Sequence, residues 1–213
     1  MLGVDDVVVN LRSDAPVGCG LGVSGACALS TSLGVHSVLG IPKCLKEIGD
    51  VAHIAEVSCR TGLGDVVAQC LGGLVVRIKP GSPTRAVADS VPMERRIVSY
   101  VVKNPIFTSD MLTSSELHKI GKIGKDCLKE FMKSPSLENF FHVSKEFSIK
   151  TELATSWVID VFEAVESEGG SVFMAMLGEC VVALGTPDCL HEFGEVFTCY
   201  TSVERARIAS KVF

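Results

Sequence analysis

A glycine-rich loop near the N-terminus constrains the fold more than any other feature of the sequence. Residues 16–26 read PVGCGLGVSGA; a valine-rich segment before them, residues 4–12, predicts a strand, and a small apolar segment after them, residues 24–39, predicts a buried helix. The first N–H groups of a helix lack internal partners and the helix dipole is positive there, so phosphate binds well at such a place. Gly20 and Gly22 let backbone amides approach phosphate oxygens closely because they carry no side chain.

Two other phosphate-binding patterns fit this loop less well. Residues 18–22 lack the G-x-G-x-x-G spacing of a dinucleotide-binding fold, and no Gly-Lys-Ser/Thr follows them, as a Walker A loop requires. A glycine loop that only turns a strand into a helix remains an alternative. Ser24 lies near the predicted helix start, where its hydroxyl can cap the helix or reach a phosphate or Mg²⁺.

A second segment, residues 53–73, carries the carboxylates that phosphoryl transfer needs. It predicts a helix that contains His53 and Glu56 on one face, then a glycine-containing turn that ends at Asp65. Phosphoryl transfer depends on charge neutralisation and in-line positioning, and a carboxylate can accept the proton of the attacking hydroxyl. Asp65 lies just before a predicted helical segment, so the helix dipole is expected to favour its ionised form.

The first pattern, P-x-x-x-G-L-G-x-S-x-A, resembles the second motif of the GHMP kinases, the superfamily of galactokinase, homoserine kinase and mevalonate kinase. The second segment and the VVRIKPGSP that follows it are most similar to archaeal pantoate kinases. The resemblance covers residues 12–83 well and continues more weakly through residues 104–108 and 174–178. It implies ATP and Mg²⁺ as cofactors and pantoate as a small-molecule substrate, phosphorylated to 4-phosphopantoate in coenzyme A biosynthesis.

The resemblance also implies roles for individual residues. Asp65 would act on the substrate hydroxyl as the catalytic residue, and Ser24 and Glu56 would bind Mg²⁺. The implied ATP-binding residues are Pro16, Gly18, Gly20, Leu21, Gly22, Ser24, Gly25 and Ala26. The implied substrate-binding residues are His53, Arg77 and Thr108, of which the arginine has the shape that a substrate carboxylate requires.

Each predicted side-chain role has a structural alternative. Asp65 in a glycine turn can be a turn residue, and Glu56 can be a solvated helix residue. His53 can be a buried or capping histidine, Arg77 can pair with a surface carboxylate, and Thr108 can be a helix N-cap. Of the family's third, glycine-rich motif only Gly178 remains, with two glycines upstream at 169 and 170, so a phosphate-binding role there is not predicted.

The whole pattern predicts an α+β protein with two lobes. Residues 1–103 would form a GHMP-kinase-like α/β phosphate-loop lobe, and residues 104–213 a C-terminal α+β lobe. In the family a substantial segment precedes the phosphate loop, so we expect a first lobe truncated at its N-terminus, with residues 4–12 as an exposed sheet edge. The other expected helices are 42–59, 115–132, 136–150 and 152–166, and the other expected strands are 74–78, 97–102, 172–176, 180–184 and 196–200.

Composition excludes several other classes of protein. Hydrophobic residues make up 47% of the chain, which excludes a disordered protein. The net charge is −5 without a basic run, which argues against nucleic acid as a partner. No apolar run is long enough for a membrane span and the first residues do not resemble a signal peptide, so a cytoplasmic protein is expected. Nine cysteines without a C-x-x-C pair fit neither a disulfide nor a metal framework.

Two alternative functions and the oligomeric state remain open at this point. The same chemistry on another small alcohol, such as homoserine, shikimate or mevalonate, differs only in the acceptor pocket. A truncated, non-catalytic nucleotide-binding homologue is the second alternative, and the presence of both Glu56 and Asp65 argues against it. A homo-oligomer is compatible with the sequence.

Overall fold

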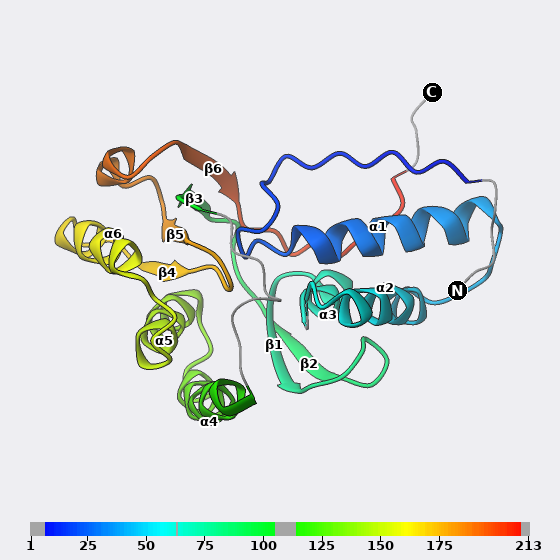
Figure 1. Ribbon diagram of the computed structural model, residues 1–213, viewed down its shortest axis with the longest axis horizontal. Helices are drawn as coiled ribbons and strands as arrows, with labels where there is room; N and C mark the ends of the chain where they lie inside the picture. Colours follow the sequence, from blue (N-terminus) through cyan, green and yellow to red (C-terminus); the bar gives the residue numbers. More distant parts are fainter. Residues whose placement is uncertain (1–6, 63, 105–113, 210–213) are drawn as a thin grey trace. The chain divides into compact units, whose positions relative to one another are not determined.

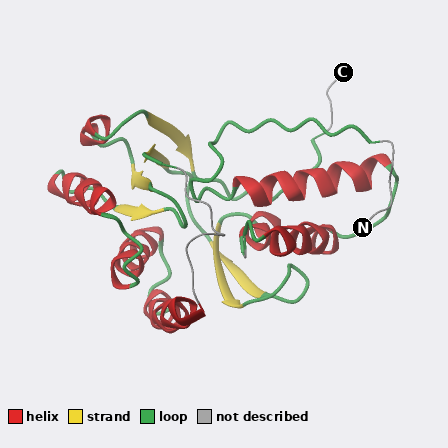
Figure 2. Ribbon diagram, in the orientation of Figure 1, coloured by secondary structure: helices red, strands yellow, loops and turns green. Residues whose placement is uncertain are grey.

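The computed structural model describes residues 7–62, 64–104 and 114–209 (Figure 1). Contacts within the chain divide these residues into two compact units. Unit 1 comprises described residues 7–16, 22–90 and 203–209, and unit 2 comprises described residues 17–21, 91–104 and 114–202. Helices and antiparallel strands occur together (Figure 2), so the α+β class predicted from the sequence is confirmed.

Unit 1 is built from three helices and a two-stranded sheet. Its elements are α1 (Val23–Val38), α2 (Leu45–Cys59), α3 (Asp65–Leu71), β1 (Leu74–Lys79) and β2 (Val87–Val91), with β1 paired to β2. The three helices enclose a small apolar core to which α1 contributes Leu29, α2 contributes Ile48 and Ala52, and α3 contributes Val66. Burial of an aliphatic side chain contributes about 1.5–3 kcal/mol, so this core holds the loop and the carboxylates that lie at the helix ends.

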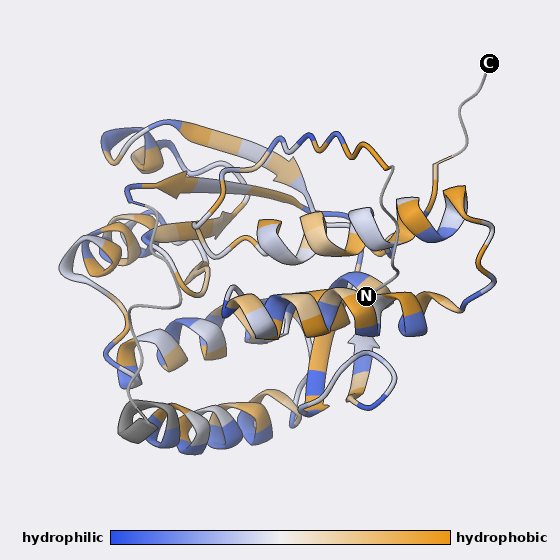
Figure 3. Cartoon of the chain, turned by 45° about the vertical axis from the view of Figure 1, so that its right-hand side comes forward, coloured by the Kyte–Doolittle hydropathy of each residue, from blue (hydrophilic) through white to orange (hydrophobic). Residues whose placement is uncertain are grey.

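Unit 2 contains a four-stranded antiparallel sheet covered by helices. Its elements are β3 (Ile97–Val102), α4 (Ser114–Phe131), α5 (Leu137–Lys150), α6 (Ser156–Ser167), β4 (Val172–Met174), β5 (Cys180–Leu184), η2 (Asp188–Glu192) and β6 (Val196–Tyr200). The strand order is β4-β5-β3-β6, with Val101 of β3 opposite Val181 on one side and Val196 on the other. Hydrophobic residues dominate these strands (Figure 3).

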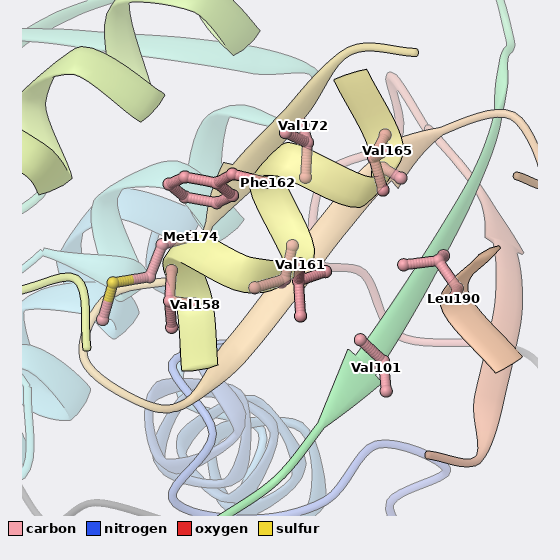
Figure 4. Packing of buried hydrophobic residues seen from close by; sticks show 10 residues of the cluster. Val101, Val158, Val161, Phe162, Val165, Val172, Met174 and Leu190 are labelled. Atoms are coloured by element: carbon pink, nitrogen blue, oxygen red, sulfur yellow. The ribbon is translucent and has the colours of Figure 1, made fainter. Parts of the chain in front are cut away.

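A hydrophobic core of unit 2 lies between α6 and this sheet (Figure 4). Val158, Val161, Phe162 and Val165 of α6 follow the i, i+3, i+4, i+7 pattern of one helix face and are at most 1% exposed. They pack with Val101, Val172, Met174, Val181, Ala183 and Leu190. The apolar periodicity of the helix and the valine-rich strands therefore account for this packing directly.

The structure corrects several of the expected elements. The helix expected over residues 42–59 begins at Leu45, and the strand expected over residues 172–176 ends at Met174. Residues 7–12, expected to belong to a strand, have no strand assignment, and Val8 is 87% exposed. A strand needs a hydrogen-bonding neighbour, and none of the described strands pairs with this segment. The helix expected to begin at residue 152 begins at Ser156 instead, because the Thr155 hydroxyl accepts a hydrogen bond from the backbone N–H of Val158 and caps it.

The boundary between the two compact units falls between Ser90 and Val91. It lies upstream of the lobe boundary that the sequence predicts between residues 103 and 104. The physical reason is that β3 pairs with β5 and β6, so it belongs to the same sheet as the C-terminal strands. A division of the kinase lobes after residue 103 stays a prediction. Among the described helices, none combines the length and the apolar character that crossing a bilayer would require.

Candidate active site

Every second residue from Gly18 to Gly22 in the glycine loop has a left-handed backbone conformation. Gly18, Gly20 and Gly22 have φ values of 80°, 75° and 69°, which side-chain-bearing residues rarely adopt. Gly22 is the N-cap of α1, and no side chain caps that helix end. No acidic residue lies in the first turn of α1. The N-terminus of α1 therefore presents backbone N–H groups and a positive dipole end, as an anion site requires.

Within unit 2, the first half of this loop packs against the turn before β5. A Cβ atom on Gly20 would lie 2.5 Å from the carbonyl oxygen of Ala175, and one on Gly178 would lie 2.7 Å from the carbonyl carbon of Cys19. Both glycines are needed because two backbone segments meet there. The remnant of the third motif thus has a structural role, which the sequence did not predict.

Within unit 1, Glu56 is the centre of a buried hydroxyl–carboxylate network. It lies near the end of α2 and is only 5% exposed. The Ser24 hydroxyl in the first turn of α1 donates to its Oε2 atom at 3.0 Å, and the Thr61 hydroxyl donates to its Oε1 atom at 2.7 Å. The two alternatives for these residues, a solvated Glu56 and a Ser24 that caps α1, are therefore wrong in this structure.

Asp65 lies beside Glu56 and beside the start of α1. It is the first residue of α3, and a Cβ atom on Gly62 would collide with Oε2 of Glu56 while lying 3.2 Å from Oδ2 of Asp65. Cβ atoms on Gly22 and Gly25 would lie 3.3 and 3.1 Å from Cβ of Asp65. The structure therefore brings together the second half of the glycine loop and both predicted carboxylates.

The electrostatic surroundings of Asp65 correct one expectation from the sequence. Burial raises the pKa of Asp65 above its ordinary value, the Glu56 carboxylate raises it further, and the Arg77 guanidinium opposes the shift. The sequence led us to expect that the dipole of the following helix would favour the ionised form. The net shift in the Asp65 pKa runs against that expectation, because desolvation and a second carboxylate both disfavour the ionised form.

The predicted substrate-binding residues differ in where the structure places them. Arg77 extends from β1 to the turn before α3, where a Cβ atom on Gly64 would lie 2.7 Å from its Nη1 atom. His53 precedes Glu56 by one turn on α2, and its Nδ1 atom is buried without a hydrogen-bond partner. Thr108 lies outside the described residues. Two of the three are thus on unit 1, and Arg77 lies close enough to influence Asp65.

Two residues of the site were not found from the sequence. Thr61 holds Oε1 of Glu56, and Gln69 on α3 donates from Nε2 to the carbonyl oxygen of Gly22 at 2.9 Å. A partial signal existed for Gln69, because it follows Asp65 by four residues and four residues separate neighbours on one helix face. No local pattern marks Thr61, since its partner depends on how the turn folds back on α2.

The oxygen atoms of this site fit Mg²⁺ better than a transition metal. Ser24 Oγ and Glu56 Oε2 lie 3.0 Å apart, and Mg²⁺ in kinases is bound by one or two carboxylates together with phosphates and water. In the described parts of the chain, no group of three or more His, Cys, Asp or Glu residues could hold a metal ion. The hydroxyl of Ser24 and the carboxylate of Glu56 are thus compatible with a Mg²⁺ ion beside a bound phosphate, and their assignment as its ligands stays a prediction.

Comparison with known proteins finds relatives over most of the chain. The family profile described as "GHMP kinases N terminal domain" matches residues 2–73. Pantoate kinase of Methanocaldococcus jannaschii is 34% identical over 195 residues, which cover 88% of this chain and 68% of the relative. Pantoate kinases of Thermococcus kodakarensis and Methanospirillum hungatei are each 32% identical, and the match covers 57% and 61% of their lengths. The chain thus spans about 57–68% of the length of these curated relatives.

Solved structures share the same fold. A protein described as "Phosphotransferase related to CoA biosynthesis pathway" superposes with a TM-score of 0.81 at 27% identity, covering 94% of this chain and 68% of that one. A putative homoserine kinase from Listeria monocytogenes gives a TM-score of 0.61 at 14% identity, covering 94% of this chain and 73% of that one. The second similarity bears on the fold alone.

Proposed function

The chain belongs to the GHMP kinase family, and we propose that it transfers the γ-phosphoryl group of ATP to a hydroxyl of pantoate, giving 4-phosphopantoate for coenzyme A biosynthesis. The observation that carries the chemistry is the buried Glu56 carboxylate bonded to Ser24 at the start of α1, with Asp65 beside it. The choice of acceptor is supported by the three relatives named pantoate kinase.

In the proposed reaction, Asp65 orients the pantoate hydroxyl and takes its proton. The hydroxyl oxygen forms a bond to the γ-phosphorus, and the bond from that phosphorus to the β–γ bridging oxygen breaks and leaves ADP. The backbone N–H groups at the start of α1 would hold the phosphates, and Ser24 and Glu56 would hold Mg²⁺. The metal ion, when bound, neutralises charge that develops on the phosphate oxygens.

The raised pKa of Asp65 suits a general base. A base is most effective when its pKa approaches the working pH, provided that it remains largely ionised there. Burial and the neighbouring Glu56 supply that increase, and Arg77 limits it. This balance is the electrostatic argument for a catalytic Asp65 over a turn residue, which would gain nothing from a raised pKa.

The experiment that tests the function is an ADP-release assay over a panel of small hydroxy acids and alcohols. Pantoate, homoserine, shikimate and mevalonate are compared on the 213-residue chain and on any longer form encoded upstream. We expect the highest kcat/KM for pantoate. Turnover of another member of the panel in preference to pantoate would change the acceptor but not the chemistry, and nucleotide binding without turnover of any would support the non-catalytic alternative.

Gly22→Val is expected to weaken ATP binding by at least tenfold. The new side chain would begin 3.3 Å from both Asp65 and Gln69, and a valine at φ 69° strains the N-cap that faces the phosphates. A tenfold change corresponds to about 1.4 kcal/mol. Calorimetric titration with ATP measures the effect.

Gly40→Val is the matched control for this variant. Gly40 also has a positive φ, 63°, but a Cβ atom there would meet nothing within 4 Å. It therefore imposes similar backbone strain away from the site. Equal ATP affinities in the two variants would contradict the assignment of the loop to phosphate.

Arg77→Ala is expected to raise the KM for pantoate much more than the KM for ATP. Loss of a charge-assisted hydrogen bond costs about 1.5–3 kcal/mol, which corresponds to a roughly 10–150-fold higher KM. Lys79→Ala on the same strand is the control, since Lys79 is an exposed cation two residues further along β1. Equal increases in both KM values would contradict this role. They would indicate that Arg77 affects the electrostatic potential of the whole site and does not bind the substrate carboxylate.

A further inference from the structure

We infer that Gln69 is a positioning residue that ties the phosphate-binding end of α1 to the helix that carries Asp65. The inference rests on the proposed function, because it assigns Gln69 a task in the reaction proposed above. Gln69 lies on α3, 47 residues from its partner Gly22, and its bond to Gly22 joins α3 to the start of α1 within unit 1.

The geometry of this contact is specific. Nε2 of Gln69 donates to the carbonyl oxygen of Gly22 at 2.9 Å, and the same oxygen accepts the N–H of Ala26 at 3.0 Å, the first hydrogen bond of α1. A carbonyl oxygen has two lone pairs, so both bonds can form together. Gln69 therefore fixes the peptide group at which the loop becomes a helix.

The contact also fixes the distance between the phosphates and the proposed base. Asp65 and Gln69 are four residues apart on α3 and so lie on one face of that helix. A Cβ atom on Gly22 would touch Cβ of Asp65 and Nε2 of Gln69 at the same distance, 3.3 Å. One turn of α3 thus contacts the start of α1 at two points, of which only the Gln69 contact is a hydrogen bond.

The backbone of α3 is itself held in place, which makes it a firm support. The N–H of Ala206, in the C-terminal segment of unit 1, donates to the carbonyl oxygen of Gln69 at 2.8 Å. Gly72 at the end of α3 packs against the same segment, since a Cβ atom there would lie 2.6 Å from the carbonyl oxygen of Val203. Movement of the start of α1 relative to Asp65 is therefore opposed by the Gln69 hydrogen bond in addition to the apolar packing between α1 and α3.

The other end of the Gln69 amide shows that this residue is not an ordinary space-filling side chain. Its Oε1 atom is buried and has no hydrogen-bond partner, a state that costs about 1–3 kcal/mol. An apolar side chain of the same size would avoid that cost. Among the described residues, only Nδ1 of His53 shares this condition, and it lies one turn from Glu56, the proposed Mg²⁺ ligand.

Gln69→Met tests the inference because methionine fills similar space but cannot donate to Gly22. We expect at least a tenfold loss of kcat with ATP, weaker ATP binding by calorimetry, and faster amide hydrogen exchange at residues 23–26. Gln69→His places an N–H donor at a similar reach and is expected to recover part of each loss. Ser90→Ala is the matched control, since the Ser90 hydroxyl donates to the carbonyl oxygen of Gly72 at the opposite end of α3, at 2.8 Å.

The outcomes separate this inference from the proposed function. Lack of turnover by the parent chain would overturn the function, whereas ATP affinity and hydrogen exchange still report on Gln69. The inference is overturned when Gln69→Met matches Ser90→Ala in ATP affinity and exchange, or when Gln69→His recovers nothing. Should Gln69→Met fail to fold, side-chain amide exchange of Gln69 in the parent decides by NMR: protection supports the bond to Gly22, and rapid exchange overturns it.

Discussion

Asp65→Asn is expected to lower kcat by about 10²–10⁴-fold while ATP affinity stays close to that of the parent. Asparagine keeps the shape of the side chain beside Gly62 and Gly25 but cannot accept the hydroxyl proton. Steady-state ADP release with pantoate gives kcat, and calorimetry gives the ATP affinity. Turnover near the parent rate would assign Asp65 to the turn and move the base elsewhere.

The pH dependence of the parent enzyme gives a second test of Asp65 as the general base. Only the ionised form of Asp65 can act as a base, so kcat/KM should fall as the pH is lowered through its raised pKa. Asp65→Asn should remove this acidic limb from the residual activity. An unchanged limb in the variant would show that another group controls it.

The same pKa shift predicts the effect on stability. A carboxyl group whose pKa is higher in the folded than in the unfolded state binds its proton more tightly when folded. Its stabilising contribution is complete below the unfolded-state pKa and is lost as the pH rises through the raised, folded-state pKa. At neutral pH Asp65→Asn should therefore unfold at the same or a higher temperature, which separates lost catalysis from lost structure.

Asp50→Asn is a suitable control for the Asp65 variant. Asp50 lies on α2 and accepts a hydrogen bond from the backbone N–H of Thr84 at 3.0 Å, which together with the Thr84 hydroxyl lowers its pKa against the effect of burial. Its replacement should change thermal stability more than kcat. The opposite pattern is expected for Asp65, so the pair distinguishes a structural from a catalytic carboxylate.

Gly62→Ala is expected to have the second largest effect, a loss of about 10²-fold in kcat. Its methyl group would collide with Oε2 of Glu56 and lie 3.2 Å from Oδ2 of Asp65. Glu56 cannot move freely, because Ser24 and Thr61 hold its two oxygens. Displacement of a reacting group by about 1 Å can lower the rate roughly 10²-fold. One methyl group at this position should therefore displace both the proposed Mg²⁺ ligand and the proposed base.

The matched control for Gly62→Ala is the same substitution at Gly34. Gly34 lies within α1, where a Cβ atom would meet nothing within 4 Å. Alanine there should raise stability by about 0.4–1 kcal/mol and leave kcat unchanged, because it only reduces the freedom of the unfolded chain. A Gly62→Ala enzyme that kept its kcat and its dependence on Mg²⁺ would show that the two carboxylates are not held as the structure indicates.

Local patterns in the sequence were sufficient for most elements. The apolar runs and turn residues place β3, β5 and β6 at the observed bounds, and α1 and α5 are displaced by only one residue at their starts. The predicted strand over residues 4–12 failed over its described part, because strand formation depends on a partner and not on valine content alone. The helical segment predicted after Asp65, for which no bounds were given, corresponds to α3. The short elements β2 and η2 were not assigned from the sequence, since they depend on contacts made after the chain has folded.

By itself, the sequence determined the family, the glycine loop at the start of a helix, and the identity of Ser24, Glu56 and Asp65 as candidates, since residue type and spacing record these directly. The tertiary structure alone decided how those residues interact: the burial of Glu56, its bonds to Ser24 and Thr61, the direction of the Asp65 pKa shift and the role of Gln69. Desolvation and hydrogen bonding between residues 32 or 47 positions apart depend on how three helices pack, and no local pattern in the chain encodes that packing.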